Sequence, residues 1–212
     1  MIVIFDLDGT VWDSLPGIVG SLEHTFETFG REVPDREVLT ANIGPPLQVM
    51  LGDLGFAPEE IDEATLVYRE RYVDRGVYEA SVYPGVPDLL AGLGDAGHRL
   101  ATATSKGEGP TRQMLDHFGL TDHFEVVGAA SMDASSMTKD AVLGRALGEL
   151  GEPDPAGCVM VGDRSYDVRG AAIHGLDCVG VLWGYGTEDE LRDAGAVHVI
   201  GEPSELPAIV QR

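Results

Sequence analysis

Two aspartates follow directly on a short apolar run at the start of the sequence. Ile2 to Phe5 is rich in β-branched and aromatic residues, and Asp6 and Asp8 come next, in the string DLDGT. The run predicts a buried strand of a parallel sheet. Residues two apart on an extended chain point to the same side, so the two carboxylates would repel unless a cation or a proton relieves them. The alternative is a strand that ends in an ordinary Asp-Gly turn.

Further polar side chains stand where other predicted strands end. Ser105 and Lys106 follow one strand, Asp163 and Asp167 follow another, and Lys139 begins a helix. Because parallel strands present their carboxyl ends at one edge of a sheet, we expect these side chains to meet there. Taken singly, each also fits a helix cap or a solvated helix end. Their occurrence together predicts a site.

The chemistry that suits this set is phosphoryl transfer. Asp6, Asp8 and Asp163 offer the hard oxygen ligands that Mg²⁺ prefers. A carboxylate beside Mg²⁺ can attack phosphorus and form an aspartyl-phosphate, and the second carboxylate can protonate the leaving oxygen and later activate water. Lys139, Ser105 and backbone N–H groups near Gly9 would bind the phosphoryl oxygens.

The elements that must position these residues fall into two groups. Residues 15–80 show helical spacing of apolar residues and no strand pattern, whereas helices and strands alternate from residue 83 onward. Alternation of this kind indicates a parallel sheet covered on both faces. We therefore predict an α/β fold, a doubly wound parallel sheet formed by residues 1–14 and 83–212, with an inserted all-helical cap domain at 15–82.

The amino-acid composition argues against some classes of binding partner. The 212 residues carry a net charge of −22, which argues against nucleic acid and anionic membranes as partners. No apolar run approaches the roughly 20 residues of a membrane span, and no basic stretch leads into an apolar signal region. Cys158 and Cys178 each precede an apolar run, which favours buried reduced thiols. We expect a cytoplasmic protein, monomeric or homodimeric, that acts on a small phosphorylated metabolite.

The order of these motifs resembles the haloacid dehalogenase (HAD) superfamily of phosphohydrolases. The resemblance covers the whole chain: DLDGT at 6–10, ATSK at 103–106, Lys139 and VGDRSYD at 161–167, with the helical block in the place of a C1-type cap. The strings IGPP at 43–46 and GVLWGYG at 180–186 are similar to phosphoglycolate phosphatase-like and 5′-nucleotidase-like members.

The resemblance implies a role for each residue. Asp6 would be the nucleophile and Asp8 the general acid/base, with the Asp8 backbone carbonyl on the metal, while Asp167 would orient the metal waters or Lys139. The predicted metal ligands are Asp6, Asp8, Asp163 and Asp167. The predicted phosphate-binding residues are Gly9, Thr10, Ser105, Lys106 and Lys139. Lys139 departs from the pattern of many members because Asp140, and not proline, follows it.

Substrate choice would lie with the helical cap. Gly44, Pro45 and Pro46 form the candidate specificity loop, since two prolines hold it rigid and glycine allows close approach; a simple loop between helices is the alternative. The activity that the resemblance implies is a Mg²⁺-dependent phosphomonoesterase for phosphoglycolate or a 5′-nucleotide. A phosphosugar mutase of the β-phosphoglucomutase type shares the same core. A phospho-acceptor without turnover is disfavoured because it has no need of Asp8.

Overall fold

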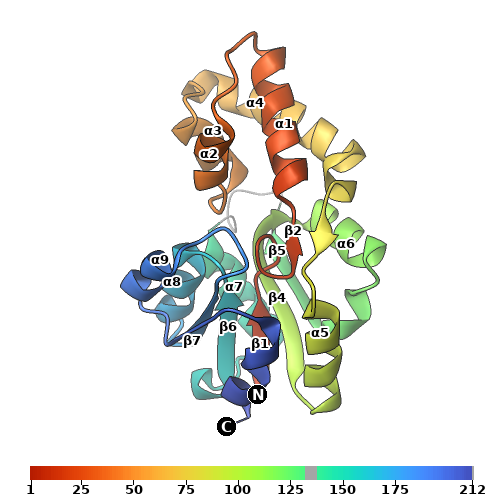
Figure 1. The fold of residues 1–212 in the computed structure, drawn as a ribbon, viewed down its shortest axis with the longest axis vertical. Coiled ribbons are helices and arrows are strands. Elements are labelled where there is room, and N and C mark those ends of the chain that lie inside the picture. The colour runs from red at the N-terminus through yellow and green to blue at the C-terminus, as the bar shows by residue number, and fades with distance from the viewer. Residues whose placement is uncertain (132–137, 212) are drawn as a thin grey trace.

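Six parallel strands form one sheet in the order β5-β4-β1-β6-β7-β8 (Figure 1). The computed structural model describes residues 1–131 and 138–211. The strands are β1 (Ile2–Phe5), β4 (Arg99–Gly107), β5 (Val126–Ala130), β6 (Cys158–Gly162), β7 (Asp177–Val181) and β8 (His198–Ile200). The chain leaves β1 toward β4 and β5 on one side and later continues with β6 to β8 on the other. In such sheets, α/β proteins bind ligands at the carboxyl ends of the strands, in the crevice where the strand order reverses. Here this point lies at β1.

Helices cover both faces of the sheet, so the strands are buried on both sides. Along β1, Val3 and Phe5 pack into one hydrophobic core, and Ile2 and Ile4 pack into a second core on the opposite face. The helices are α5 (Val86–Asp95), α6 (Glu108–His117), α7 (Lys139–Glu149), α8 (Ser165–Ile173), α9 (Glu188–Ala194) and α10 (Leu206–Val210), with 3₁₀ turns η3 (Thr121–His123), η5 (Pro155–Gly157) and η6 (Pro203–Glu205). The predicted doubly wound α/β fold is confirmed.

Residues 15–82, which we call the helical segment, stand above the carboxyl edge of the sheet in Figure 1. Their helices are α1 (Leu15–Thr28), α2 (Arg36–Ala41), α3 (Leu47–Asp53) and α4 (Ile61–Asp74), with 3₁₀ turns η1 (Pro58–Glu60) and η2 (Gly76–Tyr78). The first core continues into this segment through fully buried side chains such as Leu22, Leu39 and Leu51. Helical spacing predicted this block because each helix buries one apolar face.

A two-stranded ribbon closes the base of the helical segment. β2 (Trp12–Asp13) pairs antiparallel with β3 (Ser81–Val82), so the chain entering the segment lies beside the chain leaving it. The predicted boundaries at 14/15 and 82/83 fall at the ends of this ribbon. Two-residue strands carry no periodic pattern, and the sequence therefore did not predict them.

Local differences from the predicted elements are small. Ser105 and Lys106, predicted to follow a strand, lie within β4, which runs on to Gly107 and pairs irregularly with β5 between Thr104 and Gly107. Helix α10 was not predicted. Cys158 and Cys178 are free, buried thiols, as expected. Among the described residues, no helix has the length and apolarity needed to cross a membrane.

Candidate active site

The polar side chains at the strand ends meet around the end of β1. Asp6 follows β1 directly, and the pairing of β1 with β4 and β6 places Ser105 on one side of it and Asp163 on the other. Lys139 begins α7 and reaches across, so that its Nζ lies 2.7 Å from Asp6 Oδ1 and 2.8 Å from Asp167 Oδ1. Nζ also donates to the Ala103 carbonyl oxygen at 2.9 Å.

Three buried carboxylates form a compact cluster. Asp6, Asp163 and Asp167 each offer one oxygen, and these oxygens lie within 4.8 Å of one another. The Thr10 hydroxyl donates to Asp163 Oδ1 at 3.3 Å and the Tyr185 N–H to Asp163 Oδ2 at 2.7 Å. Close packing at Gly9 makes this possible, because its φ is +83° and a Cβ there would lie 2.3 Å from Asp163 Oδ2.

The cluster holds more negative charge than Lys139 can compensate. Burial, together with the neighbouring Asp167, raises the pKa of Asp6 to about 6 against the opposing effect of Lys139. Burial also raises the pKa of Asp163 well above its ordinary value, and Asp167 and Asp6 add to the rise. Burial lowers the pKa of Lys139, but Asp167 and Asp6 outweigh it, so that this pKa lies above its ordinary value.

This donor set fits a hard divalent cation. Three carboxylates and one ammonium, all buried, leave a net negative charge when they are ionised, and a divalent cation would relieve it. The ligand atoms are all oxygens, which Mg²⁺ prefers. The carboxylate of Asp8, whose backbone carbonyl is predicted to bind the metal, is not part of this cluster.

The Asp8 carboxylate is held by two donors of its own. Trp12 Nε1 donates to Asp8 Oδ1 at 2.8 Å, and Lys106 Nζ lies 3.0 Å from Asp8 Oδ2. The Lys106 ammonium also donates to the Tyr72 hydroxyl of α4 and stands 4.2 Å from the centre of that ring. Asp8 thus forms an ion pair apart from the acidic cluster, and Lys106 connects it to the helical segment.

A pocket of about 310 Å³ lies over these groups, between the sheet edge and the helical segment. The predicted residues that line it are Asp6, Asp8, Ser105, Lys106, Lys139, Asp167, Gly44, Pro45 and Pro46. The predicted residues Gly9, Thr10 and Asp163 are not among the residues that line it; Thr10 and Asp163 are buried and hydrogen-bonded to each other. The structure therefore brings the loop at 43–46 to the same pocket as the acidic side chains.

Sequence reasoning missed three aromatic residues at the site. Trp12 donates to Asp8, and Trp183 donates through Nε1 to the Thr10 carbonyl at 2.9 Å. The Tyr185 hydroxyl donates to Asp13 Oδ1 at 3.0 Å and accepts from the Ser14 N–H at 2.9 Å. The string GVLWGYG contains two of these residues, but nothing in it indicates their partners.

Comparison with known proteins identifies relatives along nearly the whole chain. The family model described as "Haloacid dehalogenase-like hydrolase" matches residues 3–181. Tyrosine-protein kinase PtkA of Mycobacterium tuberculosis is 48% identical over 188 residues, which cover 89% of this chain and 64% of PtkA. The chain thus corresponds to slightly less than two thirds of that relative's length.

Two further relatives match at full length. A 5′-nucleotidase of Pseudomonas aeruginosa is 35% identical over 210 residues, covering 99% of this chain and 95% of the relative. The crystal structure of a predicted phosphatase from Clostridium acetobutylicum superposes with a TM-score of 0.94 at 35% identity, covering 100% of this chain and 98% of that one.

Proposed function

Because the chain belongs to the haloacid dehalogenase-like hydrolases, we propose that it is a Mg²⁺-dependent phosphomonoesterase that uses Asp6 as its nucleophile. The observation that carries the proposal is the separation of two carboxylates in one pocket. Asp6 lies with Lys139 and the acidic cluster, whereas Asp8 is held apart by Trp12 and Lys106. Two carboxylates in different environments suit the two roles that ester hydrolysis needs.

In the first step, one bond to phosphorus forms and one breaks. An Asp6 carboxylate oxygen forms a bond to phosphorus while the bond from phosphorus to the leaving-group oxygen breaks, giving an aspartyl-phosphate on Asp6. Asp8 donates a proton to the departing oxygen, so the product leaves as an alcohol.

The second step restores the enzyme. Asp8, now ionised, takes a proton from a water molecule that attacks the phosphorus, and the bond to Asp6 breaks with release of inorganic phosphate. Trp12 and Lys106 would stabilise the ionised form of Asp8 through charge-assisted and neutral hydrogen bonds.

Binding of the phosphoryl oxygens would fall to Ser105, Lys106, Lys139 and the backbone of the turn at Gly9 and Thr10. Asp6, Asp163 and Asp167 would hold Mg²⁺, with the Asp8 carbonyl as a further ligand. When bound, Mg²⁺ would supply positive charge next to the phosphoryl group. Asp163 is in turn fixed by Thr10 and by the Tyr185 N–H.

We propose that the α/β core at 1–14 and 83–212 performs the chemistry and that the helical segment acts as a cap. A cap excludes water from the aspartyl-phosphate until the leaving group has departed. Gly44, Pro45 and Pro46 line the pocket from the helical segment, which supports a role for them in choosing the substrate. Phosphoglycolate and 5′-nucleotides are the candidate substrates, and the name of the P. aeruginosa relative supports the second.

A second candidate follows from the name of the mycobacterial relative. A tyrosine kinase passes a phosphoryl group from a nucleoside triphosphate to a phenol, and an aspartyl-phosphate that passed its group to tyrosine instead of water would do the same. The 48% identity to PtkA favours testing this reaction directly.

One assay separates these activities. The purified protein is incubated with a panel of phosphomonoesters, including phosphoglycolate and 5′-nucleotides, with and without Mg²⁺, and inorganic phosphate is measured. We expect Mg²⁺-dependent release from at least one of them. Transfer of label from ATP to a tyrosine peptide without phosphate release would instead establish the kinase, and isomerised sugar phosphate without free phosphate would establish a mutase.

A further inference from the structure

Arg164 joins the acidic side of the pocket to the helical segment. It follows Asp163 directly, and its backbone N–H donates to Asp167 Oδ2 at 3.0 Å. Its side chain lines the pocket and is only 14% exposed. None of the roles assigned above uses this side chain.

The two edges of the Arg164 guanidinium bind different parts of the molecule. Nε donates to Glu190 Oε1 of α9 at 3.0 Å, and Nη1 donates to the carbonyl oxygen of Ile43 in the helical segment. The same Glu190 oxygen accepts the Ser165 N–H at 2.9 Å, which fixes the carboxylate from a second direction. A planar fork with several donors can hold two partners at once in this way, whereas a lysine ammonium offers a single point of charge.

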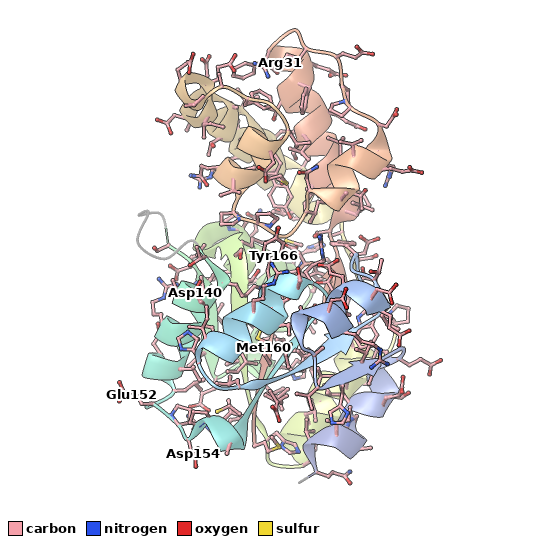
Figure 2. All side chains as sticks on the ribbon, turned by 90° about the vertical axis from the view of Figure 1, so that its left-hand side faces the viewer. Arg31, Asp140, Glu152, Asp154, Met160 and Tyr166 are labelled. Atoms are coloured by element: carbon pink, nitrogen blue, oxygen red, sulfur yellow. The ribbon has the colours of Figure 1, made fainter. Side chains whose placement is uncertain are left out.

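The loop that receives Arg164 is stiff and closely packed. Pro45 and Pro46 have restricted φ angles and no N–H, and Pro46 directly precedes α3 at its N-cap position. Gly44 has a φ of +134°, and a Cβ there would lie 3.1 Å from Cδ2 of the Tyr166 ring. Figure 2 shows Tyr166 at the boundary between the α/β core and the helical segment. In so stiff a loop, fixing the Ile43 carbonyl fixes the residues that line the pocket next to it.

We propose that Arg164 is a positioning residue, which holds the 43–46 loop over the pocket and so sets the shape of the space for the leaving group. Glu190 acts through Arg164 by orienting its guanidinium. The inference rests on the proposed function, because the role of this loop in choosing the substrate is part of that function. Arg164 itself touches no reacting atom in this scheme.

The first test measures the loop directly and needs no activity. Hydrogen exchange is followed by mass spectrometry in wild type, R164A, E190A, the double variant and R192A. Arg192 is the matched control, since it pairs with Glu188 within α9 and is 57% exposed. In R164A we expect exchange of the peptide at 42–51 to quicken about tenfold, the low end of what a hydrogen bond from a charged donor contributes.

The remaining variants decide how the effect arises. E190A is expected to quicken exchange of the same peptide less than R164A does, and to add nothing in the R164A background, because its effect passes through Arg164. R192A should leave this peptide unchanged. Equal exchange in R164A and wild type, or full additivity of the two variants, would overturn the proposal even if the phosphatase activity is confirmed.

The second test uses substrate size. With acetyl phosphate, whose leaving group is small, R164A should keep kcat/KM within about threefold of wild type. With a nucleoside monophosphate, KM should rise about tenfold with little change in kcat, again as expected for one charge-assisted hydrogen bond. A uniform loss of kcat on both substrates would assign Arg164 to the chemistry instead. Wild-type protein inactive on every ester would refute the proposed function but leave the exchange result standing.

Discussion

The pocket has two halves of opposite character. On the core side, the charged side chains form ion pairs: Lys139 with both Asp6 and Asp167, Lys106 with Asp8, and Arg164 with Glu190. The helical segment contributes mainly apolar and aromatic side chains, among them Ile18, Ile43, Pro45, Pro46, Leu47, Met50, Tyr68, Tyr72 and Val73. Its one charged lining residue, Arg69, forms no ion pair within the ranges that the structure describes.

The difference reflects two tasks. Buried charges are costly unless they are paired, and pairing also fixes their geometry. A fixed geometry suits the reaction of the phosphoryl group, which is the same in every candidate substrate. An apolar half excludes water and accepts leaving groups by shape, so it can change without disturbing the chemistry. Substitutions of the proposed reacting and metal-binding residues on the core side should therefore lower kcat for every substrate. Substitutions of Arg164 and in the helical segment should change KM for some.

The proposed nucleophile gives the largest expected effect. Asp6→Asn replaces the attacking carboxylate by an amide of the same shape, and kcat on p-nitrophenyl phosphate should fall by about 10⁴-fold or more. Asp95→Asn, at the exposed end of α5, is the matched control and should keep wild-type activity. Circular dichroism should show the same fold in both variants. Turnover by Asp6→Asn near the wild-type rate would show that another group attacks phosphorus.

The second largest effect is expected at Asp8, the proposed acid/base. Asp8→Asn keeps an oxygen for Trp12 Nε1 but can neither give nor take the proton, so kcat on an alkyl phosphate should fall about 10³-fold. The loss should be smaller with p-nitrophenyl phosphate, because a nitrophenolate leaves without protonation. An equal loss on both esters would contradict a role in protonating the leaving group.

Activity and stability that depend on the acidic cluster should change with Mg²⁺ and should not depend on the leaving group. Chelation should abolish activity on all esters, and added Mg²⁺ should restore it. Mg²⁺ at about 100 times its Kd should also raise the free energy of unfolding by about 2.7 kcal/mol, read as a higher Tm. Asp163→Asn should lose most of this shift. A variant that is stabilised by Mg²⁺ as much as wild type would place the metal elsewhere.

The sequence alone predicts the main elements of the fold and the sheet edge at which the polar side chains meet. Asp6 and Asp163 could be placed at one sheet edge because each ends an apolar strand and parallel strands align their carboxyl ends. The helical block followed from apolar periodicity. Local sequence patterns and one rule of topology are therefore enough to predict that polar side chains meet at this edge. The roles of those side chains stay predictions.

What the sequence could not predict depends on side-chain direction and on contacts between distant residues. The contacts of the Lys106 ammonium with Asp8 and Tyr72 were not predicted, because the irregular end of β4 sets a side-chain direction that no periodicity encodes. Tyr185 and Ser14 are 171 residues apart in the chain, and nothing local connects them. The ribbon of β2 and β3 is too short to leave a pattern.

The smallest effect should come from the helical segment, at Gly44. Gly44→Ala adds a Cβ 3.1 Å from the Tyr166 ring at a φ of +134°, which strains the loop by about 1–3 kcal/mol and shifts it within the pocket. We expect KM for a nucleoside monophosphate to rise by about tenfold while kcat and the exchange of core peptides stay unchanged. Gly52→Ala is the matched control, since it adds the same methyl group in α3 with nothing within 4 Å of it. A fall in kcat of Gly44→Ala on all esters would show that the two halves are not separable, because the loop would then help to hold the reacting groups as well as the leaving group.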